Sequence, residues 1–398
     1  MPLLYTIYRN IALLALGHGF GIATAVISVT ISALAAASIG ATGAMLTLPY
    51  GAQFAALLIV TIPLAKAIEL YGRKTSFLIS ALIGLAGGLL GAYGIHTKEI
   101  SFLFIAHFLI GIHLAAVNYY RFAAFDIADE KRRAIAMSLV VFGGTFAAFI
   151  GPFVARSADE LIPFTRFVAI YVSIAVLCFV VFLSIIFCHI RDQDEKKKPK
   201  IDKTLLWQTL KHPMIIGGML ASAVGYGMMN ILMITAGIQM NVIGIEFIPI
   251  SYAIQMHVLA MFAPSLFMGK IIQWVGGNKV TLIGAILMMV GTLSAMIEPK
   301  TLWGYQLALI FYGLAWNMLF VGGSYLVANH ASKDVSLKVQ AYNNLLVGLF
   351  TMFTSAIAGY SFEQLGWIKL NQLMMGAGLI LLVTLMVLYL NRKTVVKI

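Results

Sequence analysis

Twelve long apolar stretches constrain this chain more than any other feature of its sequence. The hydrocarbon core of a bilayer is roughly 30 Å thick, and a helix needs about 20 residues to cross it. Within that core the backbone N–H and C=O groups must be satisfied inside the segment, so runs of this length predict membrane-spanning helices. We expect the spans to cover residues 11–36, 44–65, 75–95, 101–124, 134–155, 164–188, 213–240, 249–269, 279–297, 303–329, 338–360 and 367–390.

The composition excludes an aqueous fold. Charged residues make up 11% of the chain, against about 25% in a soluble domain. The net charge of +12 resides in short loops between the apolar stretches, so we expect a lipid bilayer and no nucleic acid as a partner. Cys178 and Cys188 share one apolar stretch and predict buried small side chains, not a disulfide or a metal site.

The basic residues gather on one side of the predicted spans. If the N-terminus is inside, the inner segments hold 21 Lys and Arg residues and the outer loops hold five. By the positive-inside rule, this bias places both termini in the cytoplasm. We therefore expect a multi-pass protein of a bacterial-type cytoplasmic (inner) membrane.

The longest polar segment divides the spans six and six. We expect an N-terminal six-helix bundle over 1–188, a cytoplasmic linker over 189–212 and a C-terminal six-helix bundle over 213–398. The linker either lies near anionic headgroups or serves as a regulatory docking site. Segments 65–74 and 269–278 share a small residue, Lys, Ile, a polar residue and Gly in register, 204 residues apart. Two like halves are typical of secondary transporters.

The first of these segments resembles the loop signature of the major facilitator superfamily, Gly-x-x-x-Asp-x-x-Gly-Arg-Lys. Gly72, Arg73 and Lys74 match it, while Glu69 stands in place of Asp and Ala65 in place of Gly. Together with the twelve spans, the inner termini and the repeat, the resemblance covers the whole chain. It implies an all-α membrane protein with 12 transmembrane helices in two pseudo-symmetric six-helix bundles, which moves a small-molecule substrate by alternating access.

The resemblance also implies a gate. In this gate Arg73 pairs with Asp126, at the inner end of the fourth span. The network that latches the outward-open state is completed by Glu69, Gly72 and Lys74. The alternative is that Arg73 and Lys74 only anchor the topology.

Two other family signatures are incomplete. His107 occupies the Arg position of Arg-x-x-x-Gly, ahead of Gly111. The fifth span carries Gly143-Gly144 and Gly151-Pro152, as antiporters do, but lacks the glycine pair that should follow. Glycine and proline at these positions can also serve helix packing and bending.

Histidines are the titratable groups near the middle of the spans, since no Asp or Glu lies there. A neutral imidazole is cheaper to bury than a charge and can bind and release a proton. We therefore expect proton coupling through His18, His107 and His257. In a continuous helix of about 100° per residue, Asn118 and Arg121 lie within about 40° of His107. This polar stripe either faces the pathway or joins helices.

The remaining candidates for the substrate or proton pathway are amide and aromatic side chains, which suit a neutral or zwitterionic solute. Gln53 and His257 are 204 residues apart and should occupy equivalent places in the two halves. The other members of the set are Tyr226, Asn230, Gln255, Asn317, Tyr342, Asn343 and Asn344.

The sequence offers no metal-ligand spacing, no nucleophile with a nearby base and no phosphate-binding loop. We therefore expect no enzyme, cofactor or metal, and either coupling to an ion gradient or simple facilitation. The interpretation is a secondary active transporter of a small organic solute, functional as a monomer and coupled to protons, with uptake of a nutrient, vitamin or siderophore favoured. The alternatives are efflux of a drug or metabolite by proton antiport and, from another class, a membrane-embedded enzyme or a non-transporting sensor.

Overall fold

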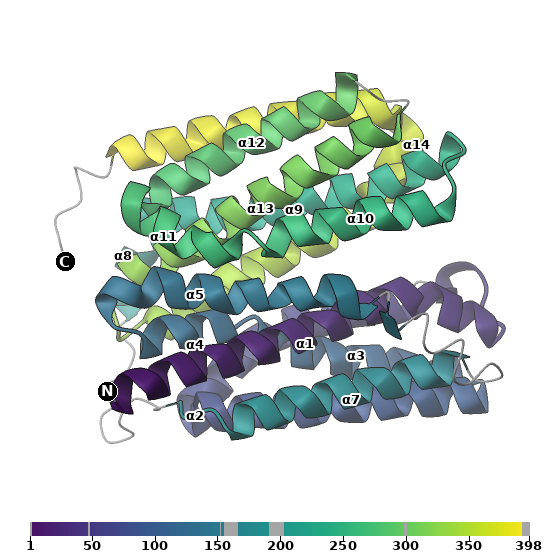
Figure 1. Ribbon diagram of the computed structural model, residues 1–398, viewed down its shortest axis with the longest axis horizontal. Helices are drawn as coiled ribbons and strands as arrows, with labels where there is room; N and C mark the ends of the chain where they lie inside the picture. The colour runs from purple at the N-terminus through teal and green to yellow at the C-terminus, as the bar shows by residue number, and fades with distance from the viewer. Residues whose placement is uncertain are drawn as a thin grey trace. The chain divides into compact units, whose positions relative to one another are not determined.

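A computed structural model describes residues 2–46, 48–151, 153–154, 166–190, 203–297 and 301–391. These residues form helices joined by short turns, and no strand occurs among them (Figure 1). Ten of the helices in the described ranges are long and apolar enough to cross a membrane. The predicted all-α membrane architecture is confirmed.

The chain divides into two compact units, Met1–Lys196 and Lys197–Ile398. The first contains α1 (Pro2–Ser38), η1 (Gly43–Leu46), α2 (Leu48–Thr97), α3 (Ile100–Val117), α4 (Tyr120–Ile127), η2 (Glu130–Arg132), α5 (Arg133–Phe142), η3 (Gly143–Phe146) and α7 (Arg166–Ile186). The second contains α8 (Lys203–Leu210), α9 (Pro213–Val242), α10 (Phe247–Phe262), α11 (Ser265–Val275), α12 (Gly277–Ile297), α13 (Leu302–His330) and α14 (Ser336–Leu390). Half of the predicted linker, residues 191–202, lies outside the described residues.

Two very long helices each contain two of the predicted spans. Gly72 interrupts α2 with φ 82° and ψ 164°, and Gly366 interrupts α14 with φ 68° and ψ 176°. Positive φ costs glycine little because it has no Cβ. Divided at these glycines, the ten helices supply the twelve predicted membrane segments. The expected loop over 66–74 is therefore one non-helical residue within an otherwise helical segment.

The internal repeat is present in the backbone. Gly40 and Gly244 have φ values of 91° and 83°, and Gly72 and Gly276 have φ values of 82° and 87°. Each pair is 204 residues apart. The helix ends at the first pair also have equivalent hydrogen bonds. The N–H of Ala41 donates to the Ala36 oxygen, and the N–H of Ile245 donates to the Met240 oxygen. Such bonds satisfy the last carbonyls of a helix that ends at a left-handed glycine.

Two predicted spans are each divided between two α-helices, and the fifth is interrupted by the 3-10 helix η3. The fourth is divided between Val117 and Tyr120, and the eighth between Phe262 and Ser265. Pro264 has no N–H to donate, which explains the second break. The eighth span also extends to Val275, beyond its predicted end at residue 269.

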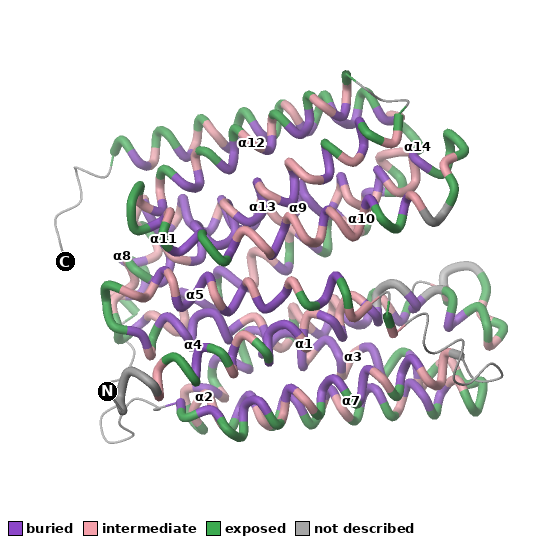
Figure 2. The backbone as a smooth tube through the Cα atoms, viewed as in Figure 1, coloured by how far each residue is buried: buried purple, intermediate pink, exposed green. Residues whose placement is uncertain are grey.

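Apolar side chains cover the outer faces of the helices as well as the core. On α12, Ile283, Ile286, Val290, Leu293 and Ile297 are exposed at helical spacing. Figure 2 shows the buried and exposed faces alternating along α7 and α12. Apolar residues on an outer face are what a lipid environment requires.

Inside each unit the helices pack through small residues. A Cβ on Gly88 of α2 would lie 2.5 Å from the backbone nitrogen of Ala175 in α7, and one on Gly218 of α9 would lie 2.7 Å from the backbone oxygen of Gly323 in α13. Such close approach is typical of membrane helices, for which van der Waals contact replaces the hydrophobic effect.

Candidate functional site

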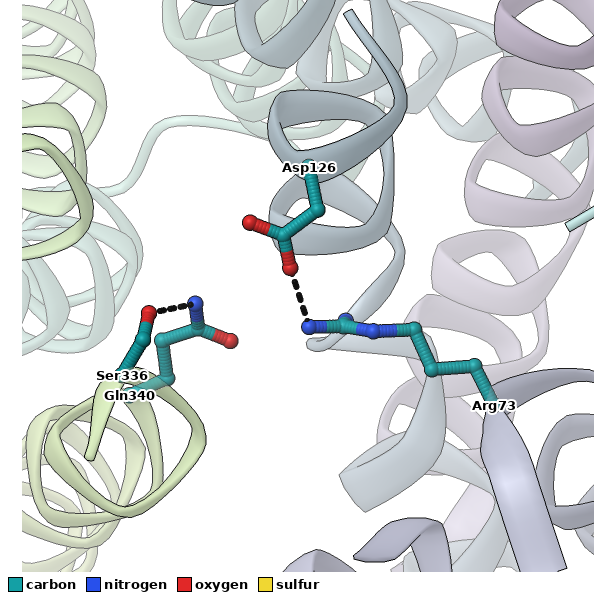
Figure 3. A network of polar contacts seen from close by, with 4 residues as sticks. All are labelled: Arg73, Asp126, Ser336 and Gln340. Atoms are coloured by element: carbon teal, nitrogen blue, oxygen red, sulfur yellow. Dashed lines mark hydrogen bonds and ion pairs between the residues drawn. The ribbon is translucent and has the colours of Figure 1, made fainter. Parts of the chain in front are cut away.

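A charge cluster lies where α2 turns at Gly72. Arg73 and Asp126 form an ion pair between α2 and α4, and Figure 3 shows the two side chains directed at one another. Their side chains are 13% and 32% exposed, so the pair is partly shielded from solvent. A second cation, Arg133, has its guanidinium 5.1 Å from the ring centroid of Phe125. The structure thus joins the two residues that the resemblance pairs.

Lys74 and Glu69 lie beside this pair but do not extend it. Lys74 Nζ donates to the Ile186 carbonyl oxygen at 2.8 Å. A cation at the last turn of α7 is favourable because the helix dipole ends there in partial negative charge. Glu69 is half-buried, and within the described ranges it has no ion pair or hydrogen bond. In this conformation the Arg73–Asp126 pair is flanked by a lysine that caps α7.

His107 belongs to a buried chain of hydrogen bonds across four helices. Its Nδ1 lies 2.9 Å from Gln53 Oε1, and its Nε2 lies 2.7 Å from the Tyr171 hydroxyl. Ser28 donates to the same Gln53 oxygen at 2.9 Å. Because an amide oxygen only accepts, His107 donates from Nδ1, and Nε2 then accepts from Tyr171. Both nitrogens of this imidazole are satisfied, as a residue that holds α1, α2, α3 and α7 together requires.

Arg121 and Asn118 form a separate group. Arg121 is 1% exposed; its Nη1 donates to the Asn118 backbone oxygen at 2.7 Å, and its guanidinium lies 4.5 Å from the centroid of Phe122. The charge of Arg121 also acts on His18 of α1. Since the fourth span breaks at Asn118, the stripe predicted for a continuous helix is divided, with His107 bonded to Gln53 and Tyr171 instead.

Gln53 and His257 occupy equivalent places in their units. A Cβ on Gly111 would lie 2.3 Å from the Gln53 backbone oxygen, and one on Gly313 would lie 2.7 Å from the His257 backbone oxygen. The same helix crossing therefore recurs in both units. The side chains differ, because His257 Nδ1 donates to the Leu309 oxygen at 2.6 Å while its buried Nε2 has no hydrogen-bond partner in the described ranges. Gln255 lies two residues earlier on α10 and is half-buried.

Asn317 hydrogen-bonds residues on both sides of the break in the eighth span. Its Nδ2 donates to the Met261 oxygen at 2.6 Å and to Ser265 Oγ at 2.5 Å. The amide thereby satisfies a carbonyl near Pro264, and this is a structural use of the residue. The neighbouring Trp316 stacks on Phe320, with ring centroids 4.8 Å apart.

Tyr226 and Asn230 lie on α9 and face two different helices. The ring of Tyr226 makes an edge contact with Trp316 of α13, with centroids 5.4 Å apart. Asn230 Nδ2 donates to the Ser355 and Thr354 hydroxyls of α14, at 2.7 Å and 3.3 Å.

Tyr342, Asn343 and Asn344 follow one another on α14 and differ in environment. Tyr342 is 36% exposed, Asn344 is 6% exposed and Asn343 is fully buried. Neither side-chain polar atom of Asn343 has a hydrogen-bond partner within the described ranges.

Sequence reasoning missed the hydroxyl partners of these residues. Ser28, Tyr171, Thr354 and Ser355 each hydrogen-bond a candidate residue, yet hydroxyl side chains are common in apolar helices and do not stand out as site residues. The available signal was spacing: Ser28 lies four residues from Thr24 and Ser32, and Thr354 and Ser355 follow Thr351 by one helical turn.

Comparison with known proteins decides the family. The sequence profile of the Major Facilitator Superfamily matches residues 12–350. The chain belongs to the major facilitator superfamily. It is 30% identical over 369 residues to the riboflavin transporter RfnT of Brucella anthropi, with 92% of each chain covered.

Solved structures of the superfamily share this fold. The proton:xylose symporter XylE matches with a TM-score of 0.80 at 14% identity, covering 98% of this chain and 96% of that one. The Escherichia coli fucose:proton symporter FucP matches with a TM-score of 0.75 at 12% identity, covering 96% and 99%. Superfamily membership identifies the chain as a multi-pass membrane transporter.

Proposed function

We propose that this superfamily member takes up riboflavin, or a flavin-like heterocycle, into a bacterial cytoplasm by proton-coupled alternating access. The observation that carries the proposal is the 30% identity to the riboflavin transporter RfnT, which extends over 92% of both chains. Aromatic and amide side chains within the spans suit such a cargo, because a flat heterocycle is bound by stacking and by directed hydrogen bonds.

Arg73 and Asp126 serve as the latch. Their ion pair joins α2 to α4 in the present conformation. Asp126 is one-third exposed, so water can reach the pair when the helices move. Breaking and remaking this contact couples rearrangement of the first unit to the transport cycle. Glu69, Gly72 and Lys74 support the latch as turn and flanking charges.

His257 is the proposed proton carrier, because its unbonded Nε2 can accept a proton without breaking an existing contact. His107 has no such free nitrogen, since both of its ring nitrogens are hydrogen-bonded. His18, Gln53, Asn118, Arg121, Tyr226, Asn230, Gln255, Asn317, Tyr342, Asn343 and Asn344 complete the proposed pathway.

The proposal includes the topology expected from the charge bias. It places the chain in a cytoplasmic membrane as a monomer with both termini inside. The bundles are 1–188 and 213–398, with 189–212 as the cytoplasmic linker.

The test is uptake in a bacterial host that cannot make riboflavin. Cells producing the chain should grow at low external riboflavin and accumulate labelled riboflavin faster than cells producing Asp126→Asn at equal membrane abundance. No accumulation above the empty host would refute the proposed cargo. Faster loss of preloaded riboflavin would assign export instead.

A further inference from the structure

Asn343 of α14 is a buried amide without hydrogen bonds. Its side chain has no exposure, and both Nδ2 and Oδ1 lack a partner within the described ranges. Among the buried amide side chains described, it alone has neither atom bonded. Buried polar groups are nearly always satisfied, so an exception points to a missing water, ion or ligand.

The surroundings of Asn343 on α14 are polar. Ser336, Gln340, Asn343, Thr351 and Thr354 fall within about 80° of one another on the helix, at about 100° per residue, and Val347 is the apolar residue in this row. Gln340 donates to Ser336 Oγ at 3.0 Å on the N-terminal side of Asn343, as Figure 3 shows. On its C-terminal side, Asn230 of α9 donates to Thr354 and to the backbone oxygen of Thr351, at 3.3 Å and 3.4 Å. Asn343 therefore lies between two satisfied groups on one polar face.

The chemistry of an amide limits what can satisfy both atoms together. Nδ2 donates and Oδ1 accepts in one plane, side by side. The complementary partner is a planar edge that carries an N–H next to a C=O, as in a lactam or a cyclic imide. A carboxylate or phosphate would instead favour the bidentate fork of an arginine.

We propose that Asn343 is a specificity-determining residue that pairs with the –CO–NH– edge of the transported heterocycle. The inference rests on the proposed function, in which the cargo is a flavin; the pyrimidinedione ring of a flavin carries such an edge at N3–H and its neighbouring carbonyl groups. A methyl group on N3 removes the donor and blocks the approach of Asn343. It leaves the rest of the ring and the ribityl chain unchanged.

The experiment measures competition for labelled riboflavin uptake in cells that produce the full chain. Unlabelled riboflavin and N3-methylriboflavin are the competitors. For the wild-type chain we expect the N3-methyl derivative to be at least about tenfold weaker, since a directed hydrogen-bonding site left with unpaired groups discriminates strongly. Equal competition by the two compounds would overturn the inference.

Variants then assign the discrimination to this residue. Asn343→Leu should weaken riboflavin competition until the two compounds compete alike. Asn343→Ser, which keeps a small polar side chain, replaces it if the leucine variant is absent from the membrane. The matched control is Asn371→Leu, because Asn371 is equally buried, in the second span of α14, but donates to the Trp367 oxygen at 2.9 Å. The control should keep the full discrimination.

The outcomes separate the two proposals. Uptake of riboflavin with discrimination that survives in the Asn343 variants would overturn the role of Asn343 and leave the proposed function standing. The same result is expected if water satisfies Asn343, because the residue would then not contact the cargo and any discrimination would come from other residues. Absence of riboflavin uptake by the wild-type chain would remove the proposed function and this inference with it.

Discussion

The closest helix approach in the first unit gives a prediction whose size follows from the structure. A Cβ at Gly143 would lie 2.0 Å from the backbone oxygen of Ala15, whereas ordinary contact begins at 3.4 Å. The obstacle is backbone, so no side-chain rotation relieves it. Gly143→Ala must therefore push α1 away from η3.

The expected loss can be bounded. Overpacking a tight contact costs about 1–3 kcal/mol, and alanine is favoured over glycine in a helix by about 1 kcal/mol. Because the obstacle is backbone at 2.0 Å, the upper part of the overpacking range, about 2–3 kcal/mol, applies. Less the gain from alanine, Gly143→Ala should lose about 1–2 kcal/mol of unfolding free energy. Gly51 of α2 is the matched control, because nothing lies within 4 Å of its Cβ position. Gly51→Ala should raise the free energy of unfolding by about 0.5–1 kcal/mol.

Thermal unfolding of the purified variants in detergent measures the difference. At roughly 2–4 °C per kcal/mol for a unit of this size, Gly143→Ala should unfold roughly 3–12 °C below Gly51→Ala. Gly313→Ala, at 2.7 Å from the His257 oxygen, should fall between them. If Gly143→Ala is as stable as Gly51→Ala, the packing of α1 described above is wrong.

Three further predictions concern charge and protonation. Arg73→Ala should lower uptake about tenfold by leaving Asp126 without its partner. The double variant that exchanges the two charges should restore part of the uptake. A double variant no more active than Arg73→Ala would argue against the latch. His257→Gln should change the pH dependence of uptake, whereas His107→Gln should lower thermal stability by about 1–3 kcal/mol through lost buried hydrogen bonds; the reverse pattern would count against the assigned roles. Nδ1 of His212 caps α9 by accepting from the Met214 N–H at 3.3 Å. Burial lowers the pKa of His212 below 6.5. The cap therefore stabilises the folded chain above pH 6.5, and this stabilisation is lost as pH falls through the lowered pKa. His212→Asn retains a cap that does not titrate, so this variant should lose less stability than the wild type on acidification. Thermal unfolding at pH 7.5 and pH 5.5 measures the two losses. Equal losses would exclude the histidine cap as the cause.

The membrane segments were accessible from the sequence because lipid imposes their length and composition. The repeat was equally legible: Gly72 and Gly276 stand 204 residues apart and both adopt positive φ. The contact between Arg73 and Asp126 followed from a family resemblance, since nothing in their spacing of 53 residues specifies it.

The polar contacts inside the bundles were not accessible in the same way. His107 bonds Gln53 and Tyr171, which lie 54 and 64 residues away. A helical projection orders residues within one helix and cannot identify the facing one. The projection also failed locally at Asn118, where the fourth span breaks, so Arg121 is grouped with Asn118 and not with His107.

Reconstitution into sealed vesicles tests the account most directly. With the purified chain in the membrane and the lumen more alkaline than the bath, labelled riboflavin should accumulate above the bath concentration, and a protonophore should abolish the gradient-driven part. Riboflavin that never exceeds its bath concentration, or accumulation that ignores the pH difference, would contradict proton-coupled uptake.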